Sequence, residues 1–91
     1  MRVLVCGSRG WTDRETVNTY LAWLITQRGP DIVIVHGAAL GADSIAAHEA
    51  TTLGLKTEAH PAQWRKHGKM AGFVRNNEML DSGVSLVVAF W

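Results

Sequence analysis

A glycine-rich turn carrying a hydroxyl and a guanidinium follows the first apolar segment of the chain. The stretch VLVCGSRGW (residues 3–11) passes from apolar side chains directly into Gly7, Ser8 and Arg9. Glycines let the backbone approach a ligand, and helix-start amides, a hydroxyl and a guanidinium can together hold an anion. A plain strand-to-helix turn explains the same residues equally well. Trp11 could stack on a base or ring, or pack as a hydrophobic staple against the helix.

A second glycine turn, in HGAALGADSIAAH, could place a carboxylate near the first. Gly37 and Gly41 bracket a loop that leads into a helix with Asp43 in its first turn, and Ala42 leaves room for a close approach to the helix start. Asp43 is either a helix cap or an acceptor for a ribose hydroxyl, with similar weight for each. His36, at the end of the preceding apolar run, is either a ligand contact or a packed ring.

The third candidate is a cationic segment, PAQWRKHGKMAGFVRNNEM (residues 61–79), which has no carboxylate before Glu78. Arg75 and Asn76 fall within an expected helix, from which their side chains could reach the edge that holds the glycine turns. Taken alone, the segment is most simply a solvated loop and helix face. The segment is predicted at the same edge of the sheet as the two glycine turns, which favours a local anion-binding role for its cations. These cations are Arg65, Lys66, Lys69 and Arg75.

These residues are positioned by a strand–helix alternation that the apolar periodicity predicts. Apolar runs predict strands over residues 2–6, 31–37 and 84–91, of which the first two are typical of the buried strands of a parallel sheet, and a short strand is expected over 55–60. Helices are expected from a cap at Thr12 to a stop at Gly29-Pro30, over 42–54 and over 70–80, with an irregular polar loop over 61–69. The alternation predicts a Rossmann-like, three-layer α/β fold with a four-stranded parallel sheet, in a single domain spanning residues 1–91. In such a fold both glycine turns lie at the edge where ligands bind.

For two of the helices the sequence also predicts the cap or the side chains that face the core. Thr12 and Glu15 have the spacing of a capping box. The apolar stripe that follows is formed by Val17, Tyr20, Leu21 and Leu24. In the helix over 70–80, the side chains expected to face inward are Met70, Phe73, Val74 and Leu80.

The composition excludes several classes of protein. A chain of 91 residues with 47% hydrophobic and 19% charged residues is typical of a small ordered domain, and its net charge of +1 argues against one built around nucleic acid or anionic membranes. The single Cys6 cannot form an internal disulfide, and the sequence shows neither a signal peptide nor a membrane-spanning run, so we expect a cytoplasmic protein. No metal or cofactor is expected, because neither His48-Glu49 nor His60 with His67 has the further ligands that a metal site needs.

Taken together, GSRGW, HGAALGADSIAAHEA, HPAQWRKHGKMAGFVRNNEML and LVVAF resemble the YspA/cpYpsA-related branch of the SLOG superfamily, over essentially the whole chain. Relatives in that superfamily include lonely-guy phosphoribohydrolases, the DNA-processing protein DprA and antiphage sensor domains that bind NAD-derived nucleotides. The resemblance implies a Rossmann-like fold with a pocket for a nucleotide or an ADP-ribose-like molecule. It implies that the pocket is lined by Gly7, Ser8, Arg9, Gly37, Gly41, Ala42, Asp43, Arg75 and Asn76.

The resemblance also implies elements beyond these 91 residues, namely a Gly-Gly-x-Gly-Thr phosphate loop after the fourth strand and a further helix and strand. In lonely-guy enzymes that loop belongs to the glycosidase machinery, so we expect binding of a nucleotide-derived molecule rather than its hydrolysis. An N-glycosidase and a DprA-like binder of single-stranded nucleic acid are the alternatives, and the near-neutral charge disfavours the latter. We also expect a homo-oligomer, because the last strand leaves an apolar edge without a partner.

Overall fold

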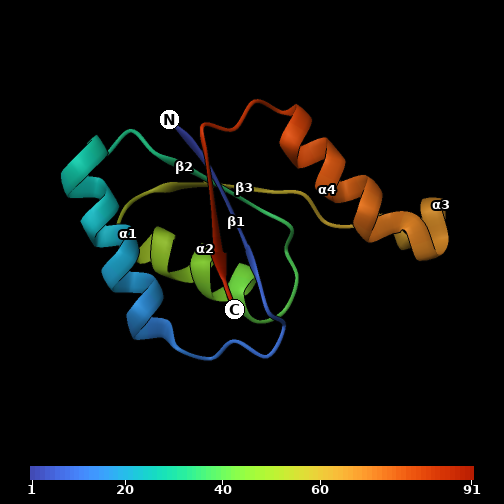
Figure 1. The fold of residues 1–91 in the computed structure, drawn as a ribbon, viewed down its shortest axis with the longest axis horizontal. Helices are drawn as coiled ribbons and strands as arrows, with labels where there is room; N and C mark the ends of the chain where they lie inside the picture. The colour runs from blue at the N-terminus through green and yellow to red at the C-terminus, as the bar shows by residue number, and fades with distance from the viewer.

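The computed structural model describes the backbone of residues 1–91 and every side chain except those of Trp64 and Phe73. Strands and helices alternate along the chain (Figure 1). The elements are β1 (Arg2–Gly7), α1 (Arg14–Arg28), β2 (Val33–His36), α2 (Ala42–Thr52), β3 (Lys56–Ala59), α3 (Trp64–His67), the short 3₁₀ helix η1 (Gly68–Met70), α4 (Ala71–Asp81) and β4 (Leu86–Phe90).

The four strands form one parallel sheet in the order β3-β2-β1-β4. In the sheet register, Leu4 of β1 lies between Val35 of β2 and Val87 of β4. The chain moves outward from β1 to β2 to β3 and then returns to the far side of β1, so the strand order reverses between β1 and β4. The predicted α/β fold is confirmed, and the reversal is the place where open parallel sheets bind ligands.

Helices cover both faces of the sheet and give it the expected three layers (Figure 1). On one face, Val3, Val5 and Ile34 join residues of α1 and α2 in the main apolar cluster. On the other face, under α4, the buried cluster consists of Leu4, Val35 and Met79. Because successive residues of a strand point to opposite faces, β1 contributes to both clusters.

Helix α1 begins one residue later than the capping-box spacing predicts. Asp13 is the N-cap: its Oδ1 accepts a hydrogen bond from the Thr16 amide (3.0 Å) and its Oδ2 one from the Thr16 hydroxyl (2.6 Å). These bonds stabilise the carboxylate and lower the pKa of Asp13. The predicted cap at Thr12 with Glu15 is therefore wrong: the helix begins at Arg14, and its N-cap is the next residue, Asp13. The predicted end is confirmed, since the helix closes at Gly29 with φ of +83°.

The segment after β3 differs more from the prediction. Residues 64–69, expected to belong to an irregular loop, form the short helix α3 and most of the 3₁₀ helix η1. Among the described side chains of α4, Ala71 and Met79 are buried, whereas Leu80 is 51% exposed and Met70, in η1, is 56% exposed. Their predicted inward orientation is wrong, because α4 packs on Leu4 and Val35 through Met79. Val74 is half-buried, and the side chain of Phe73 lies outside the described residues.

The two edge strands of the sheet differ in polarity. β3 exposes Lys56 and Thr57 along its edge, whereas β4 has the sequence LVVAF, with no charged side chain and with Val87 51% exposed. Charged side chains protect a sheet edge against pairing with another strand, and β4 lacks them. The homo-oligomer inferred from this edge stays a prediction. No helix among the described residues is long and apolar enough to cross a membrane.

Candidate functional site

The turn after β1 is tied to the start of α2 and to the end of β4. The Ser8 amide donates a hydrogen bond to the Phe90 carbonyl (2.9 Å). The Ser8 carbonyl accepts hydrogen bonds from the amides of Trp11 (3.2 Å) and Ala42 (3.1 Å). A Cβ atom on Gly41, where φ is +78°, would lie 2.3 Å from the Ser8 carbonyl oxygen, so this contact requires glycine. Three segments therefore meet at the carboxyl edge of the sheet through their backbones.

Gly37 joins an acid from α2 to a cation from α4. Its amide donates to Asp43 Oδ2 (2.9 Å), and its carbonyl accepts a hydrogen bond from Arg75 Nη1 (2.6 Å). A Cβ atom on Gly37 would lie 2.4 Å from Arg75 Nη1 and 2.9 Å from Asp43 Oδ2, so both groups approach because no side chain is present. The N-cap of α2 is Gly41, and no side chain caps this helix. Asp43 therefore holds the Gly37 amide and is not the helix cap.

The loop between β2 and α2 is held by further side chains. The Ala38 amide donates to Nδ1 of the buried His36 ring (3.1 Å), and the Ser44 hydroxyl donates to the Ala39 carbonyl (2.7 Å). Ala38 adopts a positive φ of 57° without being glycine. With the two hydrogen bonds of Gly37, these contacts define the shape of the loop.

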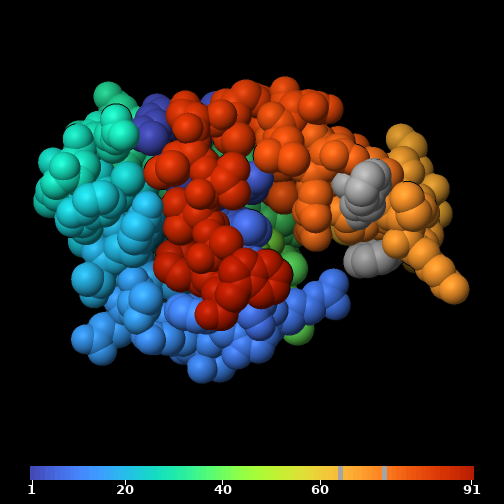
Figure 2. Space-filling model, in the orientation of Figure 1, coloured from blue at the N-terminus to red at the C-terminus, as the bar shows by residue number. Residues whose placement is uncertain are grey.

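Two adjoining cavities open at this edge of the sheet. The first, of about 270 Å³, is lined by Gly37–Leu40, by Pro61 and Ala62 after β3, and by Arg9 and Arg75. The second, of about 230 Å³, is lined by Arg9, Ala39 and Arg75 together with Cys6, Gly7, Asp43, Asn76, Met79 and Trp91. Figure 2 shows a hollow between the red C-terminal strand and the orange helix α4. Arg9, Ala39 and Arg75 line both cavities.

The two arginines give the cavities a positive character. Arg9 is exposed and forms no hydrogen bond or ion pair with the part of the chain that the structure describes. Arg75 donates only to neutral acceptors, the Gly37 carbonyl and Asn76 Oδ1 (2.8 Å). Neither guanidinium is paired with a described carboxylate, so both are free to bind an anion. The carboxylate in the lining is that of Asp43, which can accept hydrogen bonds from a ligand hydroxyl.

Six of the predicted site residues line the cavities, and they come from β1, the two glycine turns, α2 and α4: Gly7, Arg9, Gly37, Asp43, Arg75 and Asn76. The structure therefore brings together at one edge three segments that are far apart in the sequence.

The other five predicted residues make contacts outside the cavity linings. The Ser8 hydroxyl accepts a hydrogen bond from the Gly10 amide (3.1 Å). The Trp11 ring packs against Phe90, with ring centroids 5.5 Å apart. His36 and Ala42 are buried, and Gly41 contacts the turn after β1. These residues contact the elements around the cavities without lining them.

Sequence reasoning missed the apolar part of both linings. Pro61 and Ala62 lie one residue beyond the end of β3, Trp91 directly follows β4, and Leu40 lies in the loop after β2. None of these side chains has a chemistry that a motif would reveal. The rule that identified the glycine turns, the position just beyond a strand end, would have identified these residues as well.

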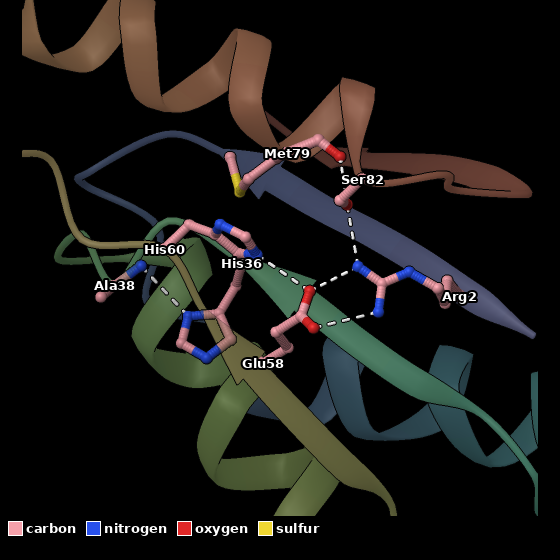
Figure 3. Close-up of polar contacts among 7 residues, drawn as sticks. All are labelled: Arg2, His36, Ala38, Glu58, His60, Met79 and Ser82. Carbon is pink, nitrogen blue, oxygen red and sulfur yellow. Dashed lines mark hydrogen bonds and ion pairs between the residues drawn. The ribbon is translucent and has the colours of Figure 1, made fainter.

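A polar network lies on the α4 face of the sheet beside the first cavity (Figure 3). Arg2 binds Glu58 through both carboxylate oxygens, and Glu58 Oε2 also contacts His60 Nε2 (2.8 Å). The hydrogen bonds from Arg2 and His60 lower the pKa of Glu58 to about 2. The His60 amide donates to the His36 carbonyl (2.8 Å), which connects this network to the strand end that precedes the loop.

The remaining titratable group in the second cavity is a thiol. Burial, with a smaller contribution from the charge of Asp43, raises the pKa of Cys6, so the thiol is protonated at neutral pH. The described residues contain no group of three or more His, Cys, Asp or Glu side chains that could hold a metal ion.

Comparisons with known proteins place the chain in a sequence family. The sequence model of the YspA, cpYpsA-related SLOG family matches residues 1–67, a segment that contains both glycine turns but not α4. The Gene 61 protein of Mycobacterium phage D29 is 43% identical over 94 aligned residues, which cover 98% of this chain and 75% of the phage protein. No solved structure matches the chain.

Proposed function

This chain belongs to the YspA, cpYpsA-related SLOG family, and on that premise we propose that it binds a nucleotide-derived small molecule at the carboxyl edge of its sheet. The observation that carries the proposal is the position of Arg9 and Arg75, which line both cavities and have no paired carboxylate among the described residues. Unpaired guanidinium groups in a concave site favour a phosphate-bearing ligand. The role is that of a sensor or sequestering module.

The two cavities favour a ligand with a moiety on each side of its phosphates. Each volume, about 270 Å³ and about 230 Å³, is below the range of roughly 300–1,000 Å³ typical of ligand pockets, and together they reach it. In the proposed pose the phosphates lie between Arg9 and Arg75, and Asp43 accepts a hydrogen bond from a ribose hydroxyl. ADP-ribose and other NAD-related molecules have this arrangement, whereas a nucleoside monophosphate would fill one cavity.

Isothermal titration calorimetry with ADP-ribose, NAD and AMP at constant salt tests the proposal. ADP-ribose is expected to bind more tightly than AMP, and mass spectrometry should recover it intact. Arg9→Ala is the most informative variant because the Arg9 side chain forms no hydrogen bond or ion pair within the described residues. It is expected to weaken binding by about 1.5–3 kcal/mol, or roughly ten- to a hundredfold in Kd. Arg28→Ala, at an exposed position of α1, is the matched control and should bind normally.

Three results would contradict the proposal. Unchanged binding by Arg9→Ala would place the phosphates elsewhere. Equal affinities for AMP and ADP-ribose would show that the two cavities are not occupied together. If the folded protein binds none of ADP-ribose, NAD and AMP, the proposed function is wrong.

An N-glycosidase is the second candidate, and the position of Asp43 favours it. Asp43 is 7% exposed and lines the second cavity, where its carboxylate could stabilise the positive charge that develops on a sugar as its glycosidic bond breaks. Chromatography of the ligand after incubation separates the two functions, because an enzyme releases free base. Asp43→Asn keeps an acceptor for the Gly37 amide, so it should abolish base release by an enzyme while leaving the loop intact.

A further inference from the structure

The wall of the first cavity contains a backbone conformation that needs support. Among the described residues, Ala38 alone has a positive φ (57°) without being glycine. The left-handed region is sterically unfavourable for alanine, so the surrounding contacts must hold it there. Because Ala38 lies within the segment that lines the first cavity, its conformation sets the shape of that wall.

The support for Ala38 depends on the protonation state of a histidine. The Ala38 amide donates to His36 Nδ1 over 3.1 Å (Figure 3), which requires a lone pair on Nδ1 and therefore the neutral ring with its proton on Nε2. A protonated imidazole has N–H groups at both nitrogens and cannot accept this bond. Among the partners of the loop, histidine is the residue whose ordinary titration falls between pH 5 and 8.

His36 also contacts a second segment that leads into the lining of the same cavity. Its carbonyl accepts a hydrogen bond from the His60 amide (2.8 Å), and the next residues along the chain, Pro61 and Ala62, line the cavity. The His36 side chain thus holds one lining segment, and its backbone contacts the residue before the other. The ring is buried, at 6% exposed, and so cannot exchange the Ala38 amide for water without a local rearrangement.

We propose, as a deepening of the proposed function on which it rests, that His36 is a positioning residue that holds the first cavity open for its ligand only while Nδ1 is unprotonated. Binding of the ligand is then pH-dependent: it is complete when His36 is neutral and is lost as the pH falls far enough to protonate the ring. The proposal rests on the hydrogen bond to the left-handed Ala38 and on the position of this loop in the cavity wall.

The charged and titratable groups around His36 set where this change occurs. Asp43 faces it from α2, His60 from the segment after β3, where it contacts Glu58, and Arg75 contacts the neighbouring Gly37 from α4. Burial lowers the pKa of His36 most, Asp43 raises it and His60 lowers it, with a net shift downward. A lowered pKa means that the ring stays neutral at neutral pH and that the loop is released only under acid conditions.

Two substitutions separate the roles of the two ring nitrogens. In His36→Asn the amide oxygen lies close to the place of Nδ1, whereas in His36→Gln the amide group reaches the place of Nε2. His36→Asn is therefore expected to keep the Ala38 hydrogen bond at every pH, and His36→Gln to lose it. His48→Gln, at an exposed position of α2, is the matched control, and circular dichroism establishes that each variant is folded.

The first measurement needs no ligand. NMR measures how fast the Ala38 amide proton exchanges with solvent. After correction for the pH dependence of base-catalysed exchange, the amide of the natural protein should be protected at about pH 7.5 and less protected at about pH 5. His36→Asn should remain protected at both pH values after the same correction, and His36→Gln should exchange faster by about tenfold, the size expected for one lost hydrogen bond. Equal protection of Ala38 in His36→Gln and the natural protein would overturn the proposal.

The second measurement is the Kd for ADP-ribose at the same pH values. We expect His36→Gln to bind about tenfold more weakly at about pH 7.5, and His36→Asn to bind normally with no loss on acidification. The same loss of affinity on acidification in His36→Asn and in the natural protein would also overturn the proposal. If ADP-ribose does not bind at all while Ala38 exchange behaves as expected, the proposed ligand fails and the positioning role of His36 stands.

Discussion

The face of the sheet under α1 and α2 and the face under α4 are built from different side chains. The first buries an extended apolar cluster that includes Val3, Leu21 and Ile34. The second buries Leu4, Val35 and Met79 and otherwise carries the Arg2–Glu58–His60 network and the second cavity. Apolar burial is the main source of folding stability, whereas polar groups at a cavity are available for chemistry. Stability thus depends mainly on the face under α1 and α2, whereas the candidate site lies at the carboxyl edge of the sheet and draws Arg75 and Asn76 from α4 on the other face.

The largest effect that tests this division is expected for Leu21→Ala. Leu21 is 0% exposed in the cluster under α1, and truncating a buried leucine typically costs about 2–5 kcal/mol of folding free energy. Urea denaturation measures the change. The matched control is Leu80→Ala on α4, where the side chain is 51% exposed and the expected change is within about 0.5 kcal/mol. Similar losses in both variants would mean that the two faces contribute equally.

A smaller effect is expected from the cap of α1, which holds the helix of the apolar face in place. Asp13→Ala removes both acceptors for Thr16 and should lower the midpoint of thermal unfolding, but by less than Leu21→Ala. Because the folded pKa of Asp13 is lowered, this contribution is present at neutral pH and should disappear on acidification. Thr12→Ala is the control. A larger decrease of the unfolding midpoint in Thr12→Ala than in Asp13→Ala would show that Thr12 is the cap of α1.

The smallest effect is expected on the polar face. Glu58 is partly exposed, so Glu58→Gln should cost less than about 1 kcal/mol at neutral pH. The folded pKa of about 2 lies below the ordinary value of 4.5, so the stabilisation is complete above that ordinary value and is lost as the pH falls from about 4.5 towards 2.

Urea denaturation of the natural protein and of Glu58→Gln, at neutral pH and at about pH 3, checks this prediction. The difference between the two proteins should shrink at the lower pH. Glu78→Gln, at an exposed position of α4, should show no such dependence. A difference between natural protein and Glu58→Gln that stays constant with pH would exclude the ion pairs as its source.

Local signals along the chain were sufficient for much of the fold. The apolar run before Gly7 predicted β1, because a strand buried on both faces requires consecutive apolar residues. Gly29 predicted the end of α1, because a positive φ favours glycine. Neighbouring good caps were harder to distinguish: Thr12 and Asp13 are adjacent, and the structure uses the second. Helix α3 has four residues, too few for the periodicity that reveals a helix.

The sequence by itself determined the parallel α/β architecture and the candidate polar groups of the site, Arg9, Asp43 and Arg75 among them, because these depend on local periodicity and on residue type. Only the tertiary structure decided which side of α4 is buried, that Arg75 reaches the Gly37 carbonyl, and that Pro61 and Trp91 complete the cavities. These features depend on where each helix crosses the sheet and on the order β3-β2-β1-β4. Contacts between distant segments follow from packing, which no single stretch of sequence contains.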